Sequence, residues 1–451
     1  MTGQGPGPHA KGDSLPPREV VRENITAALQ KLHRPERRGG VLSAAAGGRG
    51  LVLSAVAESR PVPEAEHAAL AADLLQRARE ALDAQPQNPI TVAGFNNNDD
   101  LALSLVLSQI AEKDAAAATA KPGVLKDIPG TDRYELLDPG WWASVANRLV
   151  HKRAPFISHS SLNDFRVEVD AQKLSVAMVG DWGTGLASSR EIARHMASLE
   201  PSITIHLGDV YYSGTKHEVE SRFLPTWPVG KMGTFAINSN HEMYAGGEGY
   251  FQVTLQQEPF ARHQKASYFC LSTSGWQILG LDSAYEASDF LYQKGKLSDG
   301  QLAWLGAQLA EGARRGQRTI ILTHHNPIDA HGGTDQAFLD QMLRAAEPNP
   351  FHFWYWAHEH AGVRYAPLGP NGRQYLGRCV GHGGIPYAPE KPGDAGNGVR
   401  VDWTETELAG DPEEPRRAKN GFVFLVLDSA TRKLDETFID EFGKKKASAS
   451  F

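Results

Sequence analysis

The feature that most constrains the fold is a pair of apolar runs that each end on Gly-Asp. The first run leads into Gly180-Asp181 and the second into Gly208-Asp209, with a segment of helical length, residues 188–199, between them. This pattern predicts two parallel strands joined by a right-handed crossover. Both aspartates should then lie at the edge where ligands bind in open α/β sheets. Either pair taken alone would fit a simple turn equally well.

Further apolar runs downstream also end on polar side chains. Residues 234–237 lead into Asn240-His241, residues 320–322 into His324-His325, and the run ending at Ala357 into His358 and His360. Imidazole, amide and carboxylate groups together favour iron, zinc or manganese over calcium or magnesium. A carboxylate shared by two ions holds them roughly 3.5–4 Å apart, a spacing that suits water activation and phosphoryl binding. The sequence therefore predicts a metal centre at this edge.

Strands and helices alternate from Phe165 onward, which predicts an α/β fold built as a layered sandwich. Residues 1–16 are rich in Gly and Pro and are expected to form a disordered tail. Residues 17–155 should form a mixed, mainly helical extension of unknown role. The sandwich itself is expected over residues 165–442, and residues 443–451 are expected to form a charged tail.

Three shorter expectations concern single elements. Residues 166–170 and 173–180 should pair as a β-hairpin, residues 299–313 should form a helix, and residues 421–443 should close the domain with a second hairpin.

Composition excludes several classes of protein. The 451 residues are 41% hydrophobic and 22% charged, as in an ordinary globular chain, and a net charge of −7 does not indicate nucleic-acid binding. The two cysteines, Cys270 and Cys379, form no C-x-x-C motif and fit a reducing compartment. The first residues lack the apolar segment of a signal peptide, and no run reaches the length of a membrane span. We therefore expect a cytoplasmic protein without a membrane segment, and the sequence does not indicate its oligomeric state.

The ordered set GDWG, GDVYY, SNHE, THH and AHEH resembles the signature of the calcineurin-like metallophosphoesterases, D-x-[GH], GD, GNH[DE], H and GHxH. The resemblance covers residues 174–384. Each motif alone is weak, but five in the family's order are specific. The resemblance implies an αββα sandwich that hydrolyses phosphate mono- or diesters with two metal ions and a metal-activated hydroxide.

The resemblance also implies a role for each matching residue. Asp181 and His360 would bind one ion, Asp209 would bridge both, and Asn240, one histidine of THH and His358 would bind the other. His241 would contact the phosphate and assist the leaving group, and its alternative is a histidine that only supports the ligands. From the residues themselves, we expect Glu242 to orient neighbouring groups rather than to transfer protons, and His382 either to touch the substrate or to anchor its loop.

The motif THH leaves its metal ligand ambiguous. Counting from the apolar run at residues 320–322 favours His324, whereas counting back from Pro327 as H-x-P favours His325. We favour His324 because the end of the strand sets the reach of the side chain, and His325 then becomes a substrate contact or a supporting group.

The chain departs from the family pattern at several positions. Gly183 stands where many members have a metal-binding histidine, and Ser239 and Ala357 stand where glycine is usual. In the purple acid phosphatase branch a tyrosine three residues after the bridging aspartate replaces that histidine, and here this position is Tyr212. A phenolate prefers a trivalent ion, which implies iron paired with iron, zinc or manganese. The alternative is that Tyr212 packs under its loop and the site holds manganese or zinc.

Two other functions remain open for such a chain. The same site could serve a phosphodiesterase or nuclease, or the fold could be an inactive scaffold that binds a protein partner. Missing ligands would mark a scaffold, but every position that the family requires is filled here.

Overall fold

The computed structural model describes residues 152–451, except 288, 290–291, 370–372, 390–398 and 412–414. The expectations for the tail at residues 1–16 and for nearly all of the extension at residues 17–155 lie outside the described residues. Among the described helices, none combines the length and the apolar character needed to cross a bilayer.

Two β-sheets form the described domain. The six-stranded sheet has the order β14-β13-β12-β2-β3-β4, and the eight-stranded sheet has the order β1-β5-β6-β7-β8-β10-β9-β11. The strands of the first are β2 (Lys173–Val179), β3 (Ile203–His206), β4 (Gly233–Ala236), β12 (Gly421–Asp428), β13 (Leu434–Asp440) and β14 (Lys445–Ser450). The strands of the second are β1 (Arg166–Glu168), β5 (Phe269–Ser272), β6 (Trp276–Gly280), β7 (Arg318–Leu322), β8 (Phe353–Trp356), β9 (Gly362–Tyr365), β10 (Leu376–Val380) and β11 (Val401–Thr404).

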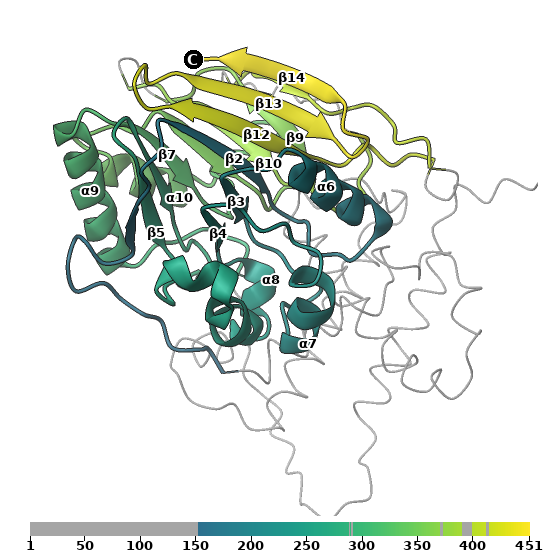
Figure 1. The fold of residues 1–451 in the computed structure, drawn as a ribbon, viewed down its shortest axis with the longest axis horizontal. Coiled ribbons are helices and arrows are strands. Elements are labelled where there is room, and N and C mark those ends of the chain that lie inside the picture. Colours follow the sequence, from purple (N-terminus) through teal and green to yellow (C-terminus); the bar gives the residue numbers. More distant parts are fainter. Residues whose placement is uncertain (1–151, 288, 290–291, 370–372, 390–398, 412–414) are drawn as a thin grey trace, which may run out of the picture. The chain divides into compact units, whose positions relative to one another are not determined.

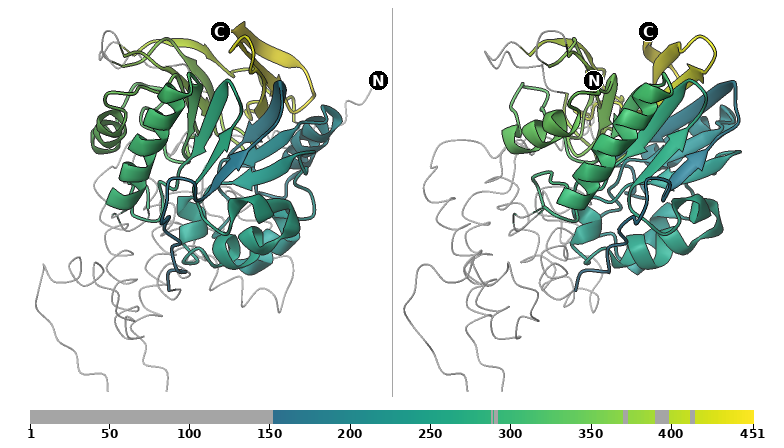
Figure 2. Two further views of the ribbon diagram at one scale, coloured as in Figure 1. Left: turned by 60° about the vertical axis from the view of Figure 1, so that its left-hand side comes forward. Right: turned by 90° about the vertical axis from the view of Figure 1, so that its left-hand side faces the viewer.

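Helices and short helical turns connect and flank the strands of the two sheets. They are α6 (Ala187–Ser198), α7 (Lys216–Glu218), α8 (Asn240–Met243), α9 (Asp299–Arg314) and α10 (Gln336–Ala345), with single turns of π-helix at Val219–Phe223 and Glu248–Val253 and of 3-10 helix at Thr254–Gln256 and Glu258–His263. Helix α6 packs against β12 of the six-stranded sheet, and α9 packs against β6 and β7 of the other. Figure 1 shows α6 and α9 on opposite sides of the strands, and α9 comes to the front in the right-hand view of Figure 2. The expected αββα sandwich is confirmed.

The central strands are apolar on both faces because both faces are covered. In β7, Ile320 and Leu322 belong to the core shared with the six-stranded sheet, whereas Ile321 packs with Leu305 and Leu309 of α9. Strands buried in this way appear in the sequence as continuous apolar runs rather than alternating ones. The runs that marked strand ends in the sequence are therefore the strands at the centre of the sandwich.

Two expectations about the chain's course are wrong. Strand β1 does not pair with β2. It pairs in parallel with β5 of the eight-stranded sheet, so between β1 and β2 the chain passes from one sheet to the other instead of turning back in a hairpin. Residues 443–451 are not a separate charged tail, because β14 pairs with β13 along the sheet edge. The ring of Phe451 packs on Phe353, with ring centroids 5.5 Å apart, and so fixes this last strand to the core.

Parallel pairing brings the carboxyl ends of the central strands together. Strands β2, β3 and β4 are mutually parallel in one sheet, and β6, β7 and β8 are parallel in the other. The crossover helix expected at residues 188–199 is α6 at Ala187–Ser198, and the helix expected at residues 299–313 is α9. The closing hairpin is formed by β12 and β13. The topology therefore supports the strand-end arrangement from which the site was predicted.

Candidate metal centre

The candidate centre lies where the ends of the two sets of parallel strands meet. Asp181 follows β2, Asp209 follows β3, Asn240 and His241 follow β4, His324 follows β7, and His358 and His360 follow β8. Two hydrogen bonds join the sheets at this edge. The backbone N–H of His358 donates to Oδ2 of Asp181 over 2.9 Å, and Nδ1 of His324 lies 2.8 Å from the carbonyl oxygen of Leu207.

Three of these residues adopt a left-handed backbone conformation. The φ angle is 55° at Asp181, 76° at Asp209 and 69° at His358. Such a conformation costs a non-glycine residue about 1–3 kcal/mol and is concentrated at functional sites. The turns are also close together, since a Cβ added to Gly180 would lie only 2.3 Å from Cβ of Ala357. The fold thus holds these three side chains in positions that relaxed turns would not provide.

The first group of candidate ligand atoms, here called the Asp181 set, belongs to Asp181, Asp209, Tyr211 and His360. The ligand atoms of Asp181, Asp209 and His360 lie within 4.8 Å of one another. The hydroxyl of Tyr211 lies 2.9 Å from Oδ1 of Asp181, 2.8 Å from Oδ2 of Asp209 and 3.1 Å from Nε2 of His360. The phenol brings one hydrogen to two carboxylate oxygens and an imidazole nitrogen, and this concentration of acceptors suits a cation.

The phenol at this position belongs to Tyr211, one residue before the tyrosine we expected. The ring of Tyr212 lies under the guanidinium of Arg222, 5.5 Å from its central carbon, and its backbone N–H donates to Glu218. The prediction of Tyr212 is therefore corrected to Tyr211. Two adjacent tyrosines follow Asp209, and spacing alone does not tell which of them turns towards the carboxylates.

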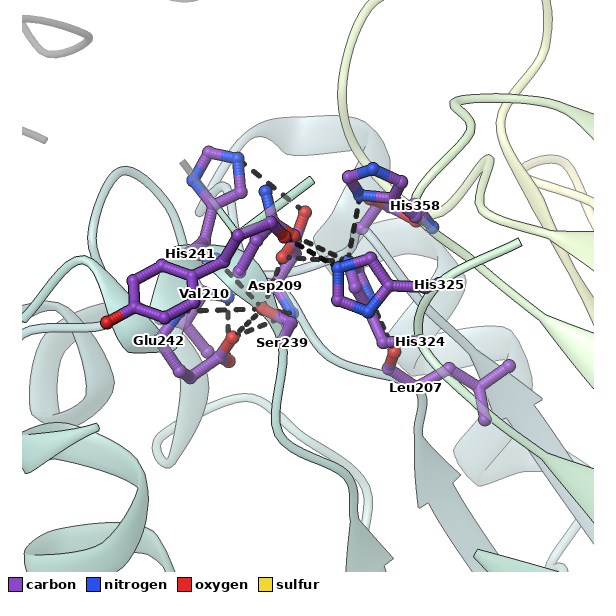
Figure 3. A network of polar contacts seen from close by, with 12 residues as sticks. Leu207, Asp209, Val210, Ser239, His241, Glu242, His324, His325 and His358 are labelled. Carbon is purple, nitrogen blue, oxygen red and sulfur yellow. Dashed lines mark hydrogen bonds and ion pairs between the residues drawn. The ribbon is translucent and has the colours of Figure 1, made fainter. Parts of the chain in front are cut away.

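The second group of candidate ligand atoms, here called the His324 set, belongs to Asp209, His324 and His358, which Figure 3 labels, and to Asn240. Nε2 of His324 lies 2.7 Å from Oδ1 of Asn240, 3.3 Å from Oδ1 of Asp209 and 3.2 Å from Nδ1 of His358. The amide nitrogen of Asn240 donates to the hydroxyl of Tyr244 over 3.1 Å, so its oxygen is the atom turned towards His324.

The proton positions in the His324 set fit a bound cation. The carbonyl oxygen of Leu207 can only accept, so Nδ1 of His324 carries the proton and Nε2 carries a lone pair. That lone pair faces the oxygens of Asn240 and Asp209, and neither oxygen can supply a hydrogen when Asp209 is ionised. A histidine that donates one N–H to a carbonyl and turns its other nitrogen towards carboxylate and amide oxygens is typical of a metal ligand.

Ionisation in the centre follows burial and neighbouring charge. Burial, together with the adjacent Asp209, raises the pKa of Asp181 well above its ordinary value. Burial alone would also raise the pKa of Asp209, but His241 and His324 hold it well below its ordinary value. Burial lowers the pKa of His324 to about 3 and that of His360 to about 4, so both rings are neutral near pH 7. Neutral imidazoles are the form that binds metals.

His325 faces away from both sets of ligand atoms. Its Nε2 lies 2.7 Å from the carbonyl oxygen of Tyr292, and its Nδ1 lies 2.8 Å from the hydroxyl of Ser283. Both ring nitrogens therefore have partners in the protein, whereas Nε2 of His324 is turned into the centre. The geometry favours His324 as the ligand from the THH motif and gives His325 a supporting place beside it.

His241 lies beside the bridging carboxylate with one fixed tautomer. Its Nδ1 lies 2.6 Å from the carbonyl oxygen of Tyr212 and must therefore donate, which leaves Nε2 facing Oδ2 of Asp209 at 3.8 Å. The imidazole packs against the rings of Tyr211 and Tyr244, with centroids 4.4 and 4.8 Å away. Nε2 of His241 is thus turned towards Asp209 over a longer distance than Nε2 of His324, which lies 3.3 Å from Oδ1 of the same carboxylate.

Two buried glutamates hold the backbone that follows β3. Glu242 accepts the N–H groups of Asp209 and Val210, 3.2 and 3.1 Å away, and burial beside Asp209 raises its pKa to about 8. Glu218 accepts from the N–H groups of Ser213 and Thr215, each 3.0 Å away. These two hydrogen bonds are compatible with the expectation that Glu242 orients its neighbours. The sequence did not indicate Glu218, although the spacing T-x-x-E is the pattern of a capping box.

His382 lies in the core rather than in a described contact with either ligand set. A Cβ added to Gly362 or Gly421 would lie 2.7 or 2.8 Å from Nε2 of His382, so the ring occupies the space left by these glycines. Its backbone carbonyl oxygen accepts the N–H of Gly421 over 2.8 Å. These contacts favour the loop-anchoring alternative over substrate contact.

Comparisons with known proteins yield matches to solved structures only. No protein-family model and no curated protein sequence matches the chain. The chain is similar to the purple acid phosphatase PPD1 from seeds of yellow lupin (Lupinus luteus), with 14% identity and a TM-score of 0.47, covering 62% of this chain and 54% of the lupin chain. This chain thus spans about half the length of the lupin protein.

Two other solved structures match at a similar level. One is GAP50, the anchor in the inner membrane complex of Plasmodium, with 11% identity and a TM-score of 0.43, covering 62% of this chain and 88% of that one. The other is a dimetal phosphatase from Danio rerio, with 11% identity and a TM-score of 0.43, covering 61% of this chain and 98% of that one.

In the described residues, two packed sheets carry outer helices, and parallel strands of both sheets end at one edge.

Proposed function

We propose that the chain is a metal-dependent hydrolase of phosphate esters whose two cations share Asp209. The observation that carries this proposal is that the two oxygens of the Asp209 carboxylate face different sets of side chains. Oδ1 of Asp209 lies 3.3 Å from Nε2 of His324, whereas Oδ2 lies 2.8 Å from the hydroxyl of Tyr211. A carboxylate whose oxygens face two separate ligand sets is what a bridged pair of metal ions requires.

The Asp181 set and the His324 set would each hold one cation. The first offers carboxylate, phenol and imidazole, which suits iron, and the second offers amide, carboxylate and imidazole, which suits iron, zinc or manganese. The bound cations would supply positive charge for the phosphoryl oxygens and lower the pKa of a water molecule. Because the ligands include only two carboxylates, a cation pair keeps excess positive charge, which favours an anionic phosphate ester as substrate.

The chain's own residues would position and protonate the substrate. Nδ1 of His241 is fixed as a donor by the Tyr212 carbonyl, so its Nε2 is the nitrogen that can give a proton to the leaving oxygen. The flanking rings of Tyr211 and Tyr244 restrict the imidazole to this orientation. Oδ2 of Asp209 lies 3.8 Å from Nε2, so this nitrogen would face the phosphoryl group beside the proposed bridging carboxylate.

The test is metal content combined with hydrolysis. Purified full-length protein, loaded with iron and zinc or manganese, should bind about two ions per chain, as expected for two ions that share one carboxylate. It should hydrolyse p-nitrophenyl phosphate or its bis-ester, lose activity when the metal is removed by a chelator, and regain it on reloading. The ratio of rates on the two substrates would distinguish a monoesterase from a diesterase or nuclease. Metal binding without hydrolysis of either ester would contradict the enzymatic proposal and leave the scaffold alternative.

A further inference from the structure

The hydroxyl group of Ser239 contacts the carboxylate of Asp209, which is proposed to bridge the two ions. Ser239 connects β4 to α8 and is completely buried. Its hydroxyl contacts Oδ1 of Asp209 and Oε2 of Glu242, and the backbone N–H of Asp209 lies 3.2 Å from the same hydroxyl oxygen. Figure 3 shows these contacts converging on Ser239 between the two acidic side chains. A glycine, the residue suggested at this position by the sequence resemblance, could make none of the side-chain contacts.

The contacts of Ser239 are not symmetric with respect to the two ligand sets. The hydroxyl touches Oδ1 of Asp209, which faces His324 at 3.3 Å. The other oxygen, Oδ2, accepts from the hydroxyl of Tyr211 at 2.8 Å. Each oxygen of the carboxylate is therefore held by a different hydroxyl group, and Ser239 holds the one that belongs to the His324 set.

We propose that Ser239 is a positioning residue for the bridging carboxylate, and that its hydroxyl makes cation binding in the His324 set stronger than Asp209 alone would provide. The inference rests on the proposed dinuclear function. A hydrogen bond to a metal-binding carboxylate fixes the direction of its lone pairs and limits its rotation, so its removal weakens the ion at the oxygen concerned. The Asp181 set keeps its own hydroxyl contact and is affected less.

A purely structural role for Ser239 must be separated from this one. The hydroxyl also caps α8, because it accepts from the backbone N–H groups of His241 and Glu242, 3.1 and 3.4 Å away. Glycine is nearly as good as serine at a cap position, whereas alanine is clearly worse. If capping were the whole role, Ser239→Gly would resemble the wild type and only Ser239→Ala would be impaired. If the hydroxyl positions Asp209, both variants should be impaired alike.

The experiment measures the two metal affinities separately. Stepwise affinities of wild type, Ser239→Gly and Ser239→Ala are determined by competition with a chelator of known affinity. We expect one step to weaken by about 10–100-fold in both variants, as for other groups that support a metal ligand, while the other step changes by less than about 3-fold. Anomalous diffraction from loaded Ser239→Gly crystals should then show the lost occupancy at the His324 set.

Ser272→Ala provides the matched control. Ser272 is equally buried, lies in β5, and its hydroxyl accepts from Arg166 and Gln317 over 2.7 and 2.9 Å. This variant loses a buried hydroxyl without touching Asp209, so both metal affinities should stay at the wild-type values. Thermal unfolding of all the variants shows whether each is folded before metal is added.

The outcomes separate the inference from the proposed function. If the wild type binds fewer than two ions, the dinuclear proposal fails. If the wild type binds two ions and Ser239→Gly binds both as the wild type does, the role of Ser239 fails alone. Equal weakening of both ions in the two variants would also overturn it, since the contacts predict an effect on one side of Asp209.

Discussion

The two sheets contribute different chemistry to the same edge. The proposed oxygen ligands, Asp181, Asp209 and Asn240, follow strands of the six-stranded sheet, and the proposed nitrogen ligands, His324, His358 and His360, follow strands of the eight-stranded sheet. Neither sheet alone carries a complete set, and each proposed ion draws on both. The proposed metal centre therefore depends on the packing of the sheets, because a small shift between them would separate the proposed oxygen ligands from the proposed nitrogen ligands.

The two sides are also supported differently. On the oxygen side, Asp209 is held by the hydroxyl groups of Ser239 and Tyr211, and Glu242 binds the backbone around it. On the nitrogen side, His324 is fixed by a carbonyl of the opposite sheet, that of Leu207. The carboxylates therefore depend on a local hydrogen-bond network, whereas this imidazole depends on the contact between layers. Substitutions on the two sides should have different consequences.

The largest effect is expected on the oxygen side, at Asp209→Asn. Asparagine has nearly the same shape but lacks the charge that both ions would share, so metal content should fall at both positions and hydrolysis should fall to background. Metal analysis and p-nitrophenyl phosphate turnover measure these effects together.

Asp282→Asn serves as the control for this substitution. Asp282 is a buried carboxylate at the end of β6 that accepts the backbone N–H groups of Ala284 and Tyr285 over 3.0 and 2.9 Å. Its variant should keep both ions. If Asp209→Asn keeps two ions and substantial turnover, Asp209 does not bridge them.

On the nitrogen side, His324→Ala and His325→Ala should differ sharply. His324→Ala removes a ligand from one set, so one of the two ions should be lost and most of the activity with it. His325→Ala removes contacts to Ser283 and Tyr292 and should lower the free energy of unfolding by about 1–3 kcal/mol while both ions remain. Metal content and chemical denaturation are measured for both variants. Loss of an ion only in His325→Ala would mean that His325, and not His324, is the ligand.

A smaller effect is expected at His241, which contributes to the chemistry without binding metal. His241→Ala should slow turnover by about 10²–10⁴-fold on esters with poor leaving groups, because no group then protonates the departing oxygen. The loss should shrink for nitrophenolate, which leaves without a proton. Metal content should stay near two ions per chain, and a variant that loses metal would place His241 among the ligands instead.

The sequence was most informative where a short motif follows a buried strand. Asp181, Asp209 and Asn240 could be located because an apolar run ends a few residues before each, and parallel neighbours must end at the same edge. The choice between His324 and His325 followed from the same rule. Strand ends set the reach of side chains, so this part of the site is encoded locally.

Other features depend on contacts between distant segments and could not be read from the sequence. Spacing favoured Tyr212, but the backbone held by Glu218 and Arg222 turns Tyr211 towards the carboxylates. The pairing of β1 with β5 is equally non-local, because the linker after β1 could continue into either sheet. Local patterns predict which residues end a strand, whereas tertiary packing decides which of two similar neighbours faces the site.

The smallest loss of turnover is expected for Tyr211→Phe. Comparing this variant with Tyr212→Phe tests which of the two tyrosines belongs to the Asp181 set. Tyr211→Phe removes one ligand of the Asp181 set but leaves Asp181, Asp209 and His360, so activity should fall less than in the other variants. Burial and the nearby carboxylates raise the pKa of the Tyr211 phenol, and a trivalent cation would counteract this by stabilising the phenolate. Iron-loaded wild type should therefore show a broad visible band from phenolate-to-iron charge transfer.

The band should vanish in Tyr211→Phe and persist in Tyr212→Phe, since the ring of Tyr212 lies against Arg222. The second variant is a matched control, because it removes the same hydroxyl group one residue away. A band that depends on Tyr212 would mean that metal binding turns the loop and restores the spacing expected from the sequence. A colourless iron-loaded wild type would remove the phenolate from the centre and leave the Asp181 set with carboxylate and imidazole ligands alone.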